Sequence, residues 1–171
     1  MISLRPAGTE DIPFIMGVER LPGYEDRVGR WSEAEHTAAL ASPDHAYFIG
    51  ENDAGCPVGF AMIQDQQDRN GNLMFRRLAV AVPGAGHGRR IFAAARDWVF
   101  RETTAHRLWL VVYRHNTVAH RLYLSCGFVE EGVAREARLL SDGSRADAIT
   151  LSLLRREWEG LTASGSIPGS V

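Results

Sequence analysis

The stretch from Ala79 to Phe92, AVAVPGAGHGRRIF, passes from an apolar run into three alternating glycines and then into a helical pattern. Glycine in regular structure costs about 1 kcal/mol of stability relative to alanine. Gly84, Gly86 and Gly88 therefore indicate that the backbone of this turn lies close to another molecule. A glycine turn that opens a helix presents unpaired N–H groups at the positive end of the helix dipole. The stretch thus predicts a site for an anion such as a pyrophosphate.

The first turn of the helix adds Arg89 and Arg90, whose positive charges favour the same anion. The alternative is a tight loop whose glycines only permit positive φ, but three alternating glycines followed by arginines favour the anion site. Two common nucleotide motifs do not fit. No lysine follows the glycines as GxxxxGK(S/T) requires, and Arg89 stands where GxGxxG needs its third glycine.

Length and composition predict one globular domain. The 171 residues are 45% hydrophobic and 23% charged, which is ordinary for a protein with a single core. We expect this domain to span residues 1–158. The segment 159–171 ends in small and polar residues, and we expect it to be disordered.

Charge and cysteine usage exclude several classes of function. A net charge of -2 and a pI near 6.3 give no general attraction for nucleic acid or an anionic membrane. No apolar run approaches the roughly 20 residues that span a bilayer, and the N-terminus lacks a signal-peptide pattern. Cys56 and Cys126 lie far apart without a partner motif. We therefore expect a cytoplasmic protein with reduced cysteines, no nucleic-acid or membrane partner and no bound metal.

Hydrophobic periodicity predicts a mixed α/β sheet with helices on both faces. Ile91, Ala95 and Val99 form one stripe of a helix over 87–102, and the apolar run 107–113 is typical of a strand buried on both faces. The expected order is a strand 2–7, a helix 10–20, a helix after the Ser32–Glu35 capping box, strands 45–52 and 57–66, a long strand 73–82, helix 87–102, strand 107–113, a helix 116–126 ended by Gly127, and strands 128–140 and 146–154.

The glycine turn resembles the acetyl-CoA pyrophosphate loop of the GNAT acyltransferase superfamily, whose motif is (Q/R)xxGxG(G/A) after a long strand. Pro83, Gly86 and Gly88 fall on that motif. Pro83 departs from it, because proline lacks the backbone N–H that the Gln or Arg position supplies.

A second signature of the same family, NxxAxxLYxxxGFxxxG, is similar to HNTVAHRLYLSCGFVEEG at 115–132. The resemblance covers about residues 2 to 158, and a looser one points to the branch that acetylates N-termini of ribosomal proteins. The second signature is matched at Asn116, Ala119, Leu122, Tyr123, Gly127, Phe128 and Gly132.

This resemblance implies the GNAT fold, a mixed and mostly antiparallel sheet of six to seven strands with helices on both faces, splayed between the fourth and fifth strands. It implies an N-acetyltransferase in which a primary amine attacks the thioester of acetyl-CoA directly. The acceptor would be a peptide or protein N-terminus, a polyamine or an amino sugar. By analogy with the family, a homodimer could form through the C-terminal strands.

The resemblance also assigns roles to residues. The strand end would pair with the pantetheine arm, the glycine turn would hold the pyrophosphate, and Asn116 would bind the arm near the thiol. Tyr123 would be the general acid that protonates the coenzyme A thiolate; the alternative is a half-buried packing aromatic. The implied cofactor-binding residues are Leu78, Ala79, Val80, Val82, Gly84, Ala85, Gly86, His87, Gly88, Arg89, Arg90, Asn116 and Tyr123.

The general base and the acceptor site are less defined by the sequence, because strand 73–82 carries no carboxylate. The candidate acceptor residues are Glu19, Tyr24, Trp31 and Arg76, and the loops 21–31 and 65–72 would determine acceptor choice. Strand alternation predicts that Arg76 and Arg77 point to opposite faces. For Trp31, core packing is the alternative to an acceptor wall. We expect these charged or titratable residues to be surface groups: Glu19, Glu25, Asp26, His36, His87 and His115.

Two other classes of function remain open at this point. A non-catalytic domain of the same fold that senses acyl-CoA would agree with Pro83 and with the missing carboxylate. Asn116 and Tyr123, which are intact, favour the enzyme. A nucleotide-binding oxidoreductase would require a nicotinamide or flavin to bind.

Overall fold

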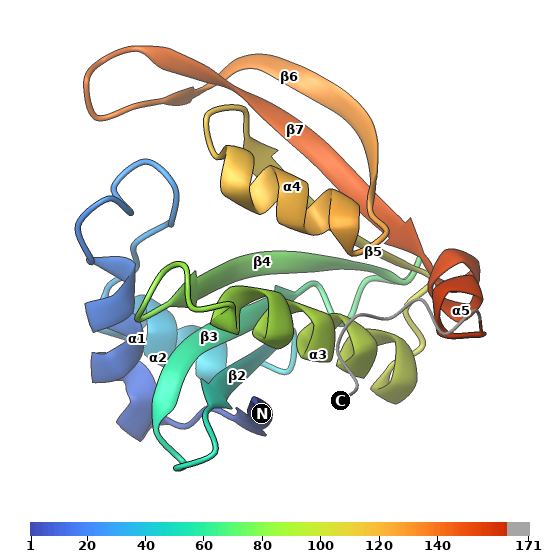
Figure 1. Cartoon of the computed structure of the whole chain (residues 1–171), viewed down its shortest axis with the longest axis horizontal. Helices are drawn as coiled ribbons and strands as arrows, with labels where there is room; N and C mark the ends of the chain where they lie inside the picture. The colour runs from blue at the N-terminus through green and yellow to red at the C-terminus, as the bar shows by residue number, and fades with distance from the viewer. Residues whose placement is uncertain (164–171) are drawn as a thin grey trace.

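The computed structural model describes residues 1–163, and one seven-stranded sheet forms their centre (Figure 1). Its order is β1-β2-β3-β4-β5-β7-β6, and neighbouring strands are antiparallel except for the parallel pair β4–β5. This confirms the predicted mostly antiparallel sheet. The strands are β1 (Ser3–Pro6), β2 (His45–Glu51), β3 (Pro57–Gln64), β4 (Asn72–Val80), β5 (Arg107–Tyr113), β6 (Val129–Leu139) and β7 (Arg145–Leu154).

Helices cover both faces of the sheet because successive side chains of each strand point to opposite sides. Phe48 of β2 packs in one buried cluster with residues of α3, whereas its neighbours Tyr47 and Ile49 pack in a second cluster beside α1 and α2. The predicted bounds of α3 and of β5 are confirmed to the residue. The helical elements are η1 (Thr9–Asp11), α1 (Ile12–Glu19), α2 (Glu33–Leu40), α3 (His87–Glu102), α4 (Thr117–Ser125) and α5 (Arg155–Ala163).

The sheet opens in its middle, as the resemblance implies. β4 and β5 pair only over Asn72–Met74 and Arg107–Trp109. Beyond these residues β4 continues along β3 and β5 continues along β7. Within residues 1–163, the later part of β4 therefore has a backbone edge with no strand beside it.

The C-terminal end differs from the prediction. Residues 159–163 were expected to begin a disordered tail, but they belong to α5; residues 164–171 lie outside the described part of the chain. The Trp158 ring stacks on Phe100 with centroids 5.4 Å apart, and its Nε1 donates a hydrogen bond to Asp97 at 2.8 Å. These partners come from α3, so tertiary packing outweighs the weak local helix signal.

Two further expectations concern surfaces. No helix within residues 1–163 is long and apolar enough to cross a bilayer. β6 is exposed along nearly all of its length and presents Val129, Val133 and Leu139 to solvent. A homodimer through the C-terminal strands stays a prediction.

Arg155 closes the C-terminal end of α3. Its guanidinium donates hydrogen bonds to the carbonyls of Phe100, Thr103 and Ala105 at 2.6, 2.9 and 2.8 Å. We expect Arg155→Ala to lower the free energy of unfolding by about 2–3 kcal/mol, because three carbonyls lose a charged donor. Urea unfolding followed by circular dichroism measures this. The exposed neighbour Arg156 is the control: if Arg156→Ala lowers stability equally, the contacts of Arg155 are not what stabilises this end.

Candidate functional site

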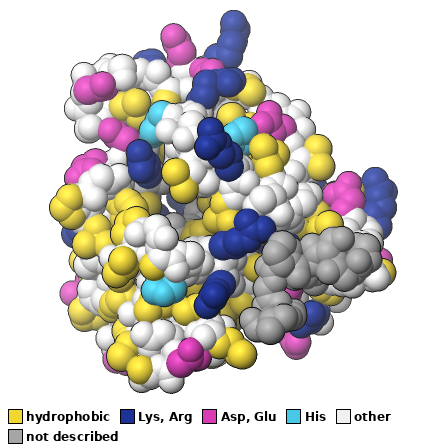
Figure 2. Space-filling model, in the orientation of Figure 1, with side chains coloured by type: hydrophobic (Ala, Val, Ile, Leu, Met, Phe, Trp, Pro, Cys, Tyr) yellow, Lys and Arg dark blue, Asp and Glu magenta, His cyan; other side chains and the backbone are white. Residues whose placement is uncertain are grey.

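The divergence of β4 from β5 creates a cavity of about 740 Å³. This volume is within the usual range for small-molecule sites. Figure 2 shows the face of the molecule in the orientation of Figure 1, with hydrophobic and basic side chains around a hollow in its middle. The cavity is lined by Tyr24, Arg27, Val28, Gly29, Phe75, Arg76, Arg77, Leu78, Ala79, Val80, Pro83, Gly84, Gly86, Gly88, Arg89, Val111, Val112, Tyr113, Asn116, Val118, Ala119, Arg121, Leu122, Tyr123 and Ser125.

Most residues singled out from the sequence meet at this cavity. Those in its lining are Leu78, Ala79, Val80, Gly84, Gly86, Gly88, Arg89, Asn116, Tyr123, Tyr24 and Arg76. Others lie nearby along the chain but outside the lining: Val82, Ala85, His87, Arg90, Glu19 and Trp31. The sequence did not single out Arg27, Val111, Tyr113 and Arg121, which also line it, because only the tertiary fold places them there.

The glycine turn has the backbone geometry of an anion site. Gly84 and Gly86 have φ values of 84° and 78°, a region that strongly favours glycine. Gly86 is the N-cap of α3 and supplies no side-chain hydrogen bond, so the N–H groups of the first turn remain available. A phosphate group fits this turn, because the N–H donors and the helix dipole act together.

Arginines complete this side of the cavity. Arg89 donates a hydrogen bond to Ser125 Oγ at 3.0 Å, which links the start of α3 to the end of α4. Among the described residues, neither Arg89 nor Arg121 has a carboxylate within ion-pair distance. Their charges are therefore available to an anionic ligand; that Arg89 binds one stays a prediction.

Tyr123 of α4 lies between the hydrophobic core and the cavity. Its ring packs against Phe92 and Phe128, with centroids 4.8 and 6.4 Å away. Within residues 1–163 no protein group forms a hydrogen bond with its hydroxyl, and burial raises the pKa of that hydroxyl well above its usual value near 10. Tyr123 is therefore a protonated donor at neutral pH.

Asn116 begins α4 and Cys126 follows it. Asn116 Oδ1 accepts a hydrogen bond from the Ala119 N–H at 3.4 Å, so the side chain caps the helix and its amide NH₂ stays free to donate. Cys126 is buried, and burial raises the pKa of its thiol. A protonated, buried thiol outside the lining is consistent with packing and not with nucleophilic catalysis.

A β-bulge in β4 corrects the expectation for its two arginines. Met62 pairs with Arg77 and Ile63 pairs with Phe75, so Arg76 is an extra residue in β4. The guanidinium carbons of Arg76 and Arg77 lie 5.9 and 4.9 Å from the centroid of the Trp31 ring. Both arginines therefore reach the same side of the sheet and line the cavity, whereas simple alternation would separate them.

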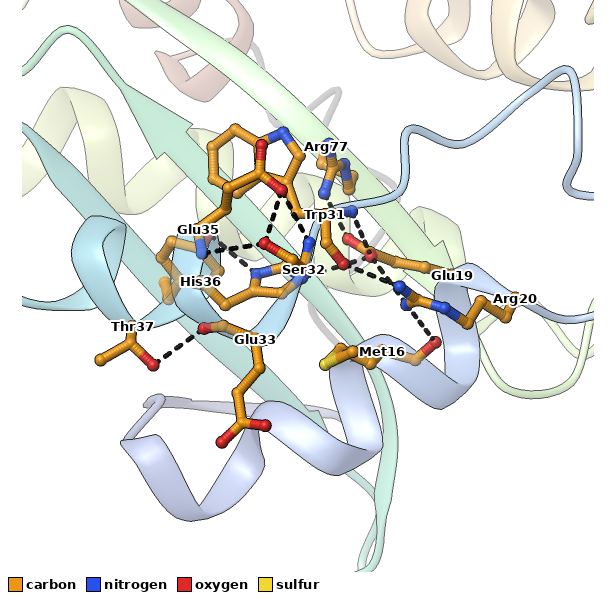
Figure 3. A network of polar contacts seen from close by, with 11 residues as sticks. Met16, Glu19, Arg20, Trp31, Ser32, Glu33, Glu35, His36, Thr37 and Arg77 are labelled. Atoms are coloured by element: carbon orange, nitrogen blue, oxygen red, sulfur yellow. Dashed lines mark hydrogen bonds and ion pairs between the residues drawn. The ribbon is translucent and has the colours of Figure 1, made fainter.

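Glu19 and His36 are not surface residues, contrary to the prediction. Both side chains are completely buried, and they form a polar network with Arg77 and Trp31 (Figure 3). The Glu19 carboxylate accepts a hydrogen bond from the Arg77 guanidinium and another from the backbone N–H of Trp31 at 3.2 Å. His36 Nε2 lies 3.2 Å from the same carboxylate, and His36 Nδ1 lies 3.2 Å from the Tyr47 hydroxyl.

The electrostatics of this network determine the protonation of Glu19. Burial raises the pKa of the carboxyl, but the His36 contact, the charge of Arg77 and the Trp31 N–H outweigh that effect and leave the pKa below its ordinary value of 4.5. Glu19 is thus an ionised group whose charge is balanced by Arg77. It lies outside the cavity lining, and no aspartate, glutamate or histidine is among the lining residues within 1–163. The cavity wall therefore offers no side-chain general base.

The loop 21–30 is held against the open end of the sheet. The Tyr24 hydroxyl donates a hydrogen bond to the Val80 carbonyl at 2.9 Å. The Asp26 carboxylate accepts hydrogen bonds from the N–H and hydroxyl of Ser141 at 2.8 and 2.6 Å, and its carbonyl lies 3.0 Å from His115 Nε2. Asp26 thus has a structural role that the sequence did not predict, whereas Glu25 is exposed as expected.

We expect Glu19→Gln to lower the free energy of unfolding by about 3–5 kcal/mol, because Arg77 would remain buried without its counter-charge. In the native protein the depressed pKa of Glu19 stabilises the fold above pH 4.5, and this contribution is lost as pH falls through the lower folded pKa. Urea unfolding between pH 3 and pH 7 would detect both effects.

Glu33 is the matched control, since its exposed carboxylate on α2 forms no hydrogen bond or ion pair within residues 1–163 (Figure 3). Glu33→Gln should change stability by under about 1 kcal/mol. Equal effects of the two substitutions would contradict the expectation that buried Arg77 requires Glu19 as its counter-charge.

Comparisons with known proteins agree with this geometry. The sequence model of the Acetyltransferase (GNAT) family matches residues 17–128. The spermidine N-acetyltransferase from Vibrio cholerae in complex with CoA and spermine superposes with a TM-score of 0.83 at 22% identity, over 92% of this chain and 98% of that chain. The spermidine/spermine N-acetyltransferase from the same organism in complex with manganese ions gives 0.79 at 22% identity, over 93% and 95%. At these identities the structural likeness shows a shared fold.

Proposed function

The chain belongs to the GNAT acetyltransferase family, and from this premise we propose that it transfers the acetyl group of acetyl-CoA directly to a primary amine, with Tyr123 as the general acid. As a member of this family it is an acyltransferase that uses acetyl-CoA as co-substrate, which confirms the resemblance seen in the two motifs. The acceptor and the roles of individual residues are the content of the proposal.

The observation that carries the proposal is the arrangement of one continuous cavity. The uncapped start of α3 and Arg89 lie at one side of it, Tyr123 lines its interior, and the loop 21–30 borders its other side. We infer that the glycine turn holds the pyrophosphate. Gly84 and Arg89 would compensate for the missing N–H of Pro83, because both lie in the same turn and both line the cavity.

The free edge of β4 would hold the pantetheine arm. The Ala81 N–H donates to the Val58 carbonyl, so in an antiparallel ladder the backbone groups of Leu78 and Val80 point to the opposite edge. The Val80 carbonyl already accepts a hydrogen bond from the Tyr24 hydroxyl. The groups left for an added extended chain are the N–H and carbonyl of Leu78 and the N–H of Val80.

In the transfer, the neutral amine attacks the thioester carbon, a C–N bond forms and the C–S bond breaks. The departing thiolate takes a proton from the Tyr123 hydroxyl, and the nitrogen of the product releases its extra proton to water. Water accepts this proton because the cavity wall has no carboxylate or imidazole. Tyr123 then recovers its proton from solvent, so atoms and charges balance over one turnover.

Two classes of acceptor are the main candidates. A peptide or protein N-terminus agrees with the looser resemblance of the sequence, and a polyamine agrees with the names of the structural neighbours. Calorimetry with acetyl-CoA, followed by thiol release against both classes of amine, tests the proposal. Binding of acetyl-CoA without release from any amine would instead favour a non-catalytic acyl-CoA sensor.

We expect Arg89→Gln to weaken acetyl-CoA binding about 10- to 100-fold, because one charge-assisted contact with phosphate is lost. Isothermal titration calorimetry measures the dissociation constant. Arg101→Gln removes an exposed guanidinium outside the cavity lining and should leave the constant unchanged. If the two variants bind equally well, Arg89 does not contact the co-substrate.

We expect Tyr123→Phe to reduce kcat about 10²- to 10⁴-fold while the affinity for acetyl-CoA stays within a few-fold, because only the proton donor is removed. In the native enzyme, kcat/KM should rise with pH as the acceptor amine loses its proton. Because the pKa of Tyr123 is raised, no fall in rate should follow below about pH 10. A fall near neutral pH, or an active Phe variant, would contradict this role.

A further inference from the structure

The charge of the cavity wall carries information about the acceptor. Among the described residues of the lining, the charged ones are arginines and none is acidic. Arg89 and Arg121 belong to α3 and α4, on the side where the pyrophosphate would bind. Arg27, Arg76 and Arg77 lie on the opposite side, where the loop 21–30 and β4 border the cavity.

The three arginines on the acceptor side are not equivalent. Arg77 is buried, and its charge is balanced by the buried carboxylate of Glu19. Arg76 is exposed at the bulge of β4, and no carboxylate lies within 4.0 Å of it among residues 1–163. Its guanidinium lies over the Trp31 ring, which restrains its position from one side. Arg76 is thus an uncompensated, partly oriented cation at the acceptor side.

Most acidic residues near this side are bound to other groups, and the exposed carboxylate of Glu25 in the loop 21–30 lies 3.9 Å from the Arg30 guanidinium. Glu19 is fully buried against Arg77, and Glu35 is bound to the N–H and hydroxyl of Ser32. Asp26 is bound to Ser141, as described above. None of these carboxylates lines the cavity. Among the described residues that line the cavity, a polycation would meet arginines and no carboxylate.

We propose that the acceptor is a primary amine that also carries a carboxylate, which pairs with the Arg76 guanidinium, and that polyamines are poor acceptors. This inference rests on the proposed acetyl transfer and specifies its substrate class. A guanidinium binds a carboxylate through two parallel hydrogen bonds, which gives affinity and orientation together. The same positive wall repels a second or third ammonium group. The transfer step itself, with its bonds and protons, is unchanged.

Two sources supply this chemistry, a free amino acid and a peptide N-terminus with an acidic side chain. The test therefore compares matched pairs that differ only in the carboxylate: 4-aminobutyrate with 4-aminobutanamide, and the N-terminal peptides Asp-Ala-Ala and Asn-Ala-Ala, both amidated. Spermidine is the cationic probe. Thiol release is expressed per concentration of neutral amine, so that differences in amine pKa do not enter. The chain has no lysine, which limits background self-acetylation to its N-terminus.

We expect kcat/KM for a carboxylated amine to exceed that of its amide, and that of spermidine, at least 10-fold. Arg76→Gln should abolish this preference and Arg76→Glu should reverse it toward spermidine. Arg156→Gln, which removes an exposed guanidinium from α5, should keep the preference. The pair that shows the effect identifies the source as a free amino acid or a peptide. Higher kcat/KM for spermidine, or a preference that survives Arg76→Glu, would overturn the proposal.

Binding separates this inference from the proposed activity. Calorimetry with the CoA-saturated protein measures the affinity of each amine without turnover. Tighter binding of the carboxylated member, lost in Arg76→Gln, supports the inference even if no thiol is released, an outcome that would reject the transfer. Thiol release from spermidine with no binding advantage for a carboxylate would support the transfer and reject the inference.

Discussion

The separation of β4 from β5 after three paired residues is the constraint on which the rest of the structure depends. A strand edge inside a protein leaves N–H and carbonyl groups that require partners, and burying them unpaired would be costly. This chain meets the requirement partly with Tyr24, whose hydroxyl donates a hydrogen bond to the Val80 carbonyl. The rest of the edge is open to the cavity. The opening that would weaken an ordinary sheet is thus the place where, under the proposed function, an extended ligand would gain backbone contacts.

The bulge at Arg76 links this opening to the buried polar network. Before the bulge, Leu73 and Phe75 face the α3 cluster, and after it Leu78 and Val80 face the same cluster. Because the bulge shifts the alternation of side chains by one residue, Arg77 points to the opposite face of the sheet. There its guanidinium donates a hydrogen bond to Glu19 of α1. A buried ion pair adds little net stability, because desolvation offsets most of the attraction. What it does here is to fix the position of α1 and of Trp31 relative to β4.

How much of this was predictable from the sequence depends on the range of each interaction. The bounds of α3 and β5 follow from periodicity within the segment, and the glycine turn and Tyr123 follow from motifs that are short in sequence. The environment of Glu19 does not, because its partner Arg77 lies 58 positions away. The bulge that brings Arg76 and Arg77 to one side shifts the apolar pattern of β4, but Met74 and Ala79 on the other face are also apolar and obscure the shift. For α5, the stabilising contacts of Trp158 come from α3.

In the proposed transfer, the lack of a carboxylate or imidazole among the described residues of the cavity wall is physically connected to the excess of arginine there. A bound ammonium that faces uncompensated positive charge loses its proton more readily, since nearby like charge lowers its pKa. Ordinarily a carboxylate in the same molecule would oppose this by stabilising the ammonium. Pairing that carboxylate with Arg76 removes the opposition, and the remaining charge of Arg27 favours the neutral amine. A wall that binds the carboxylate of such an acceptor would thereby also raise the fraction of its amine that is neutral and can attack, so that water is a sufficient proton acceptor.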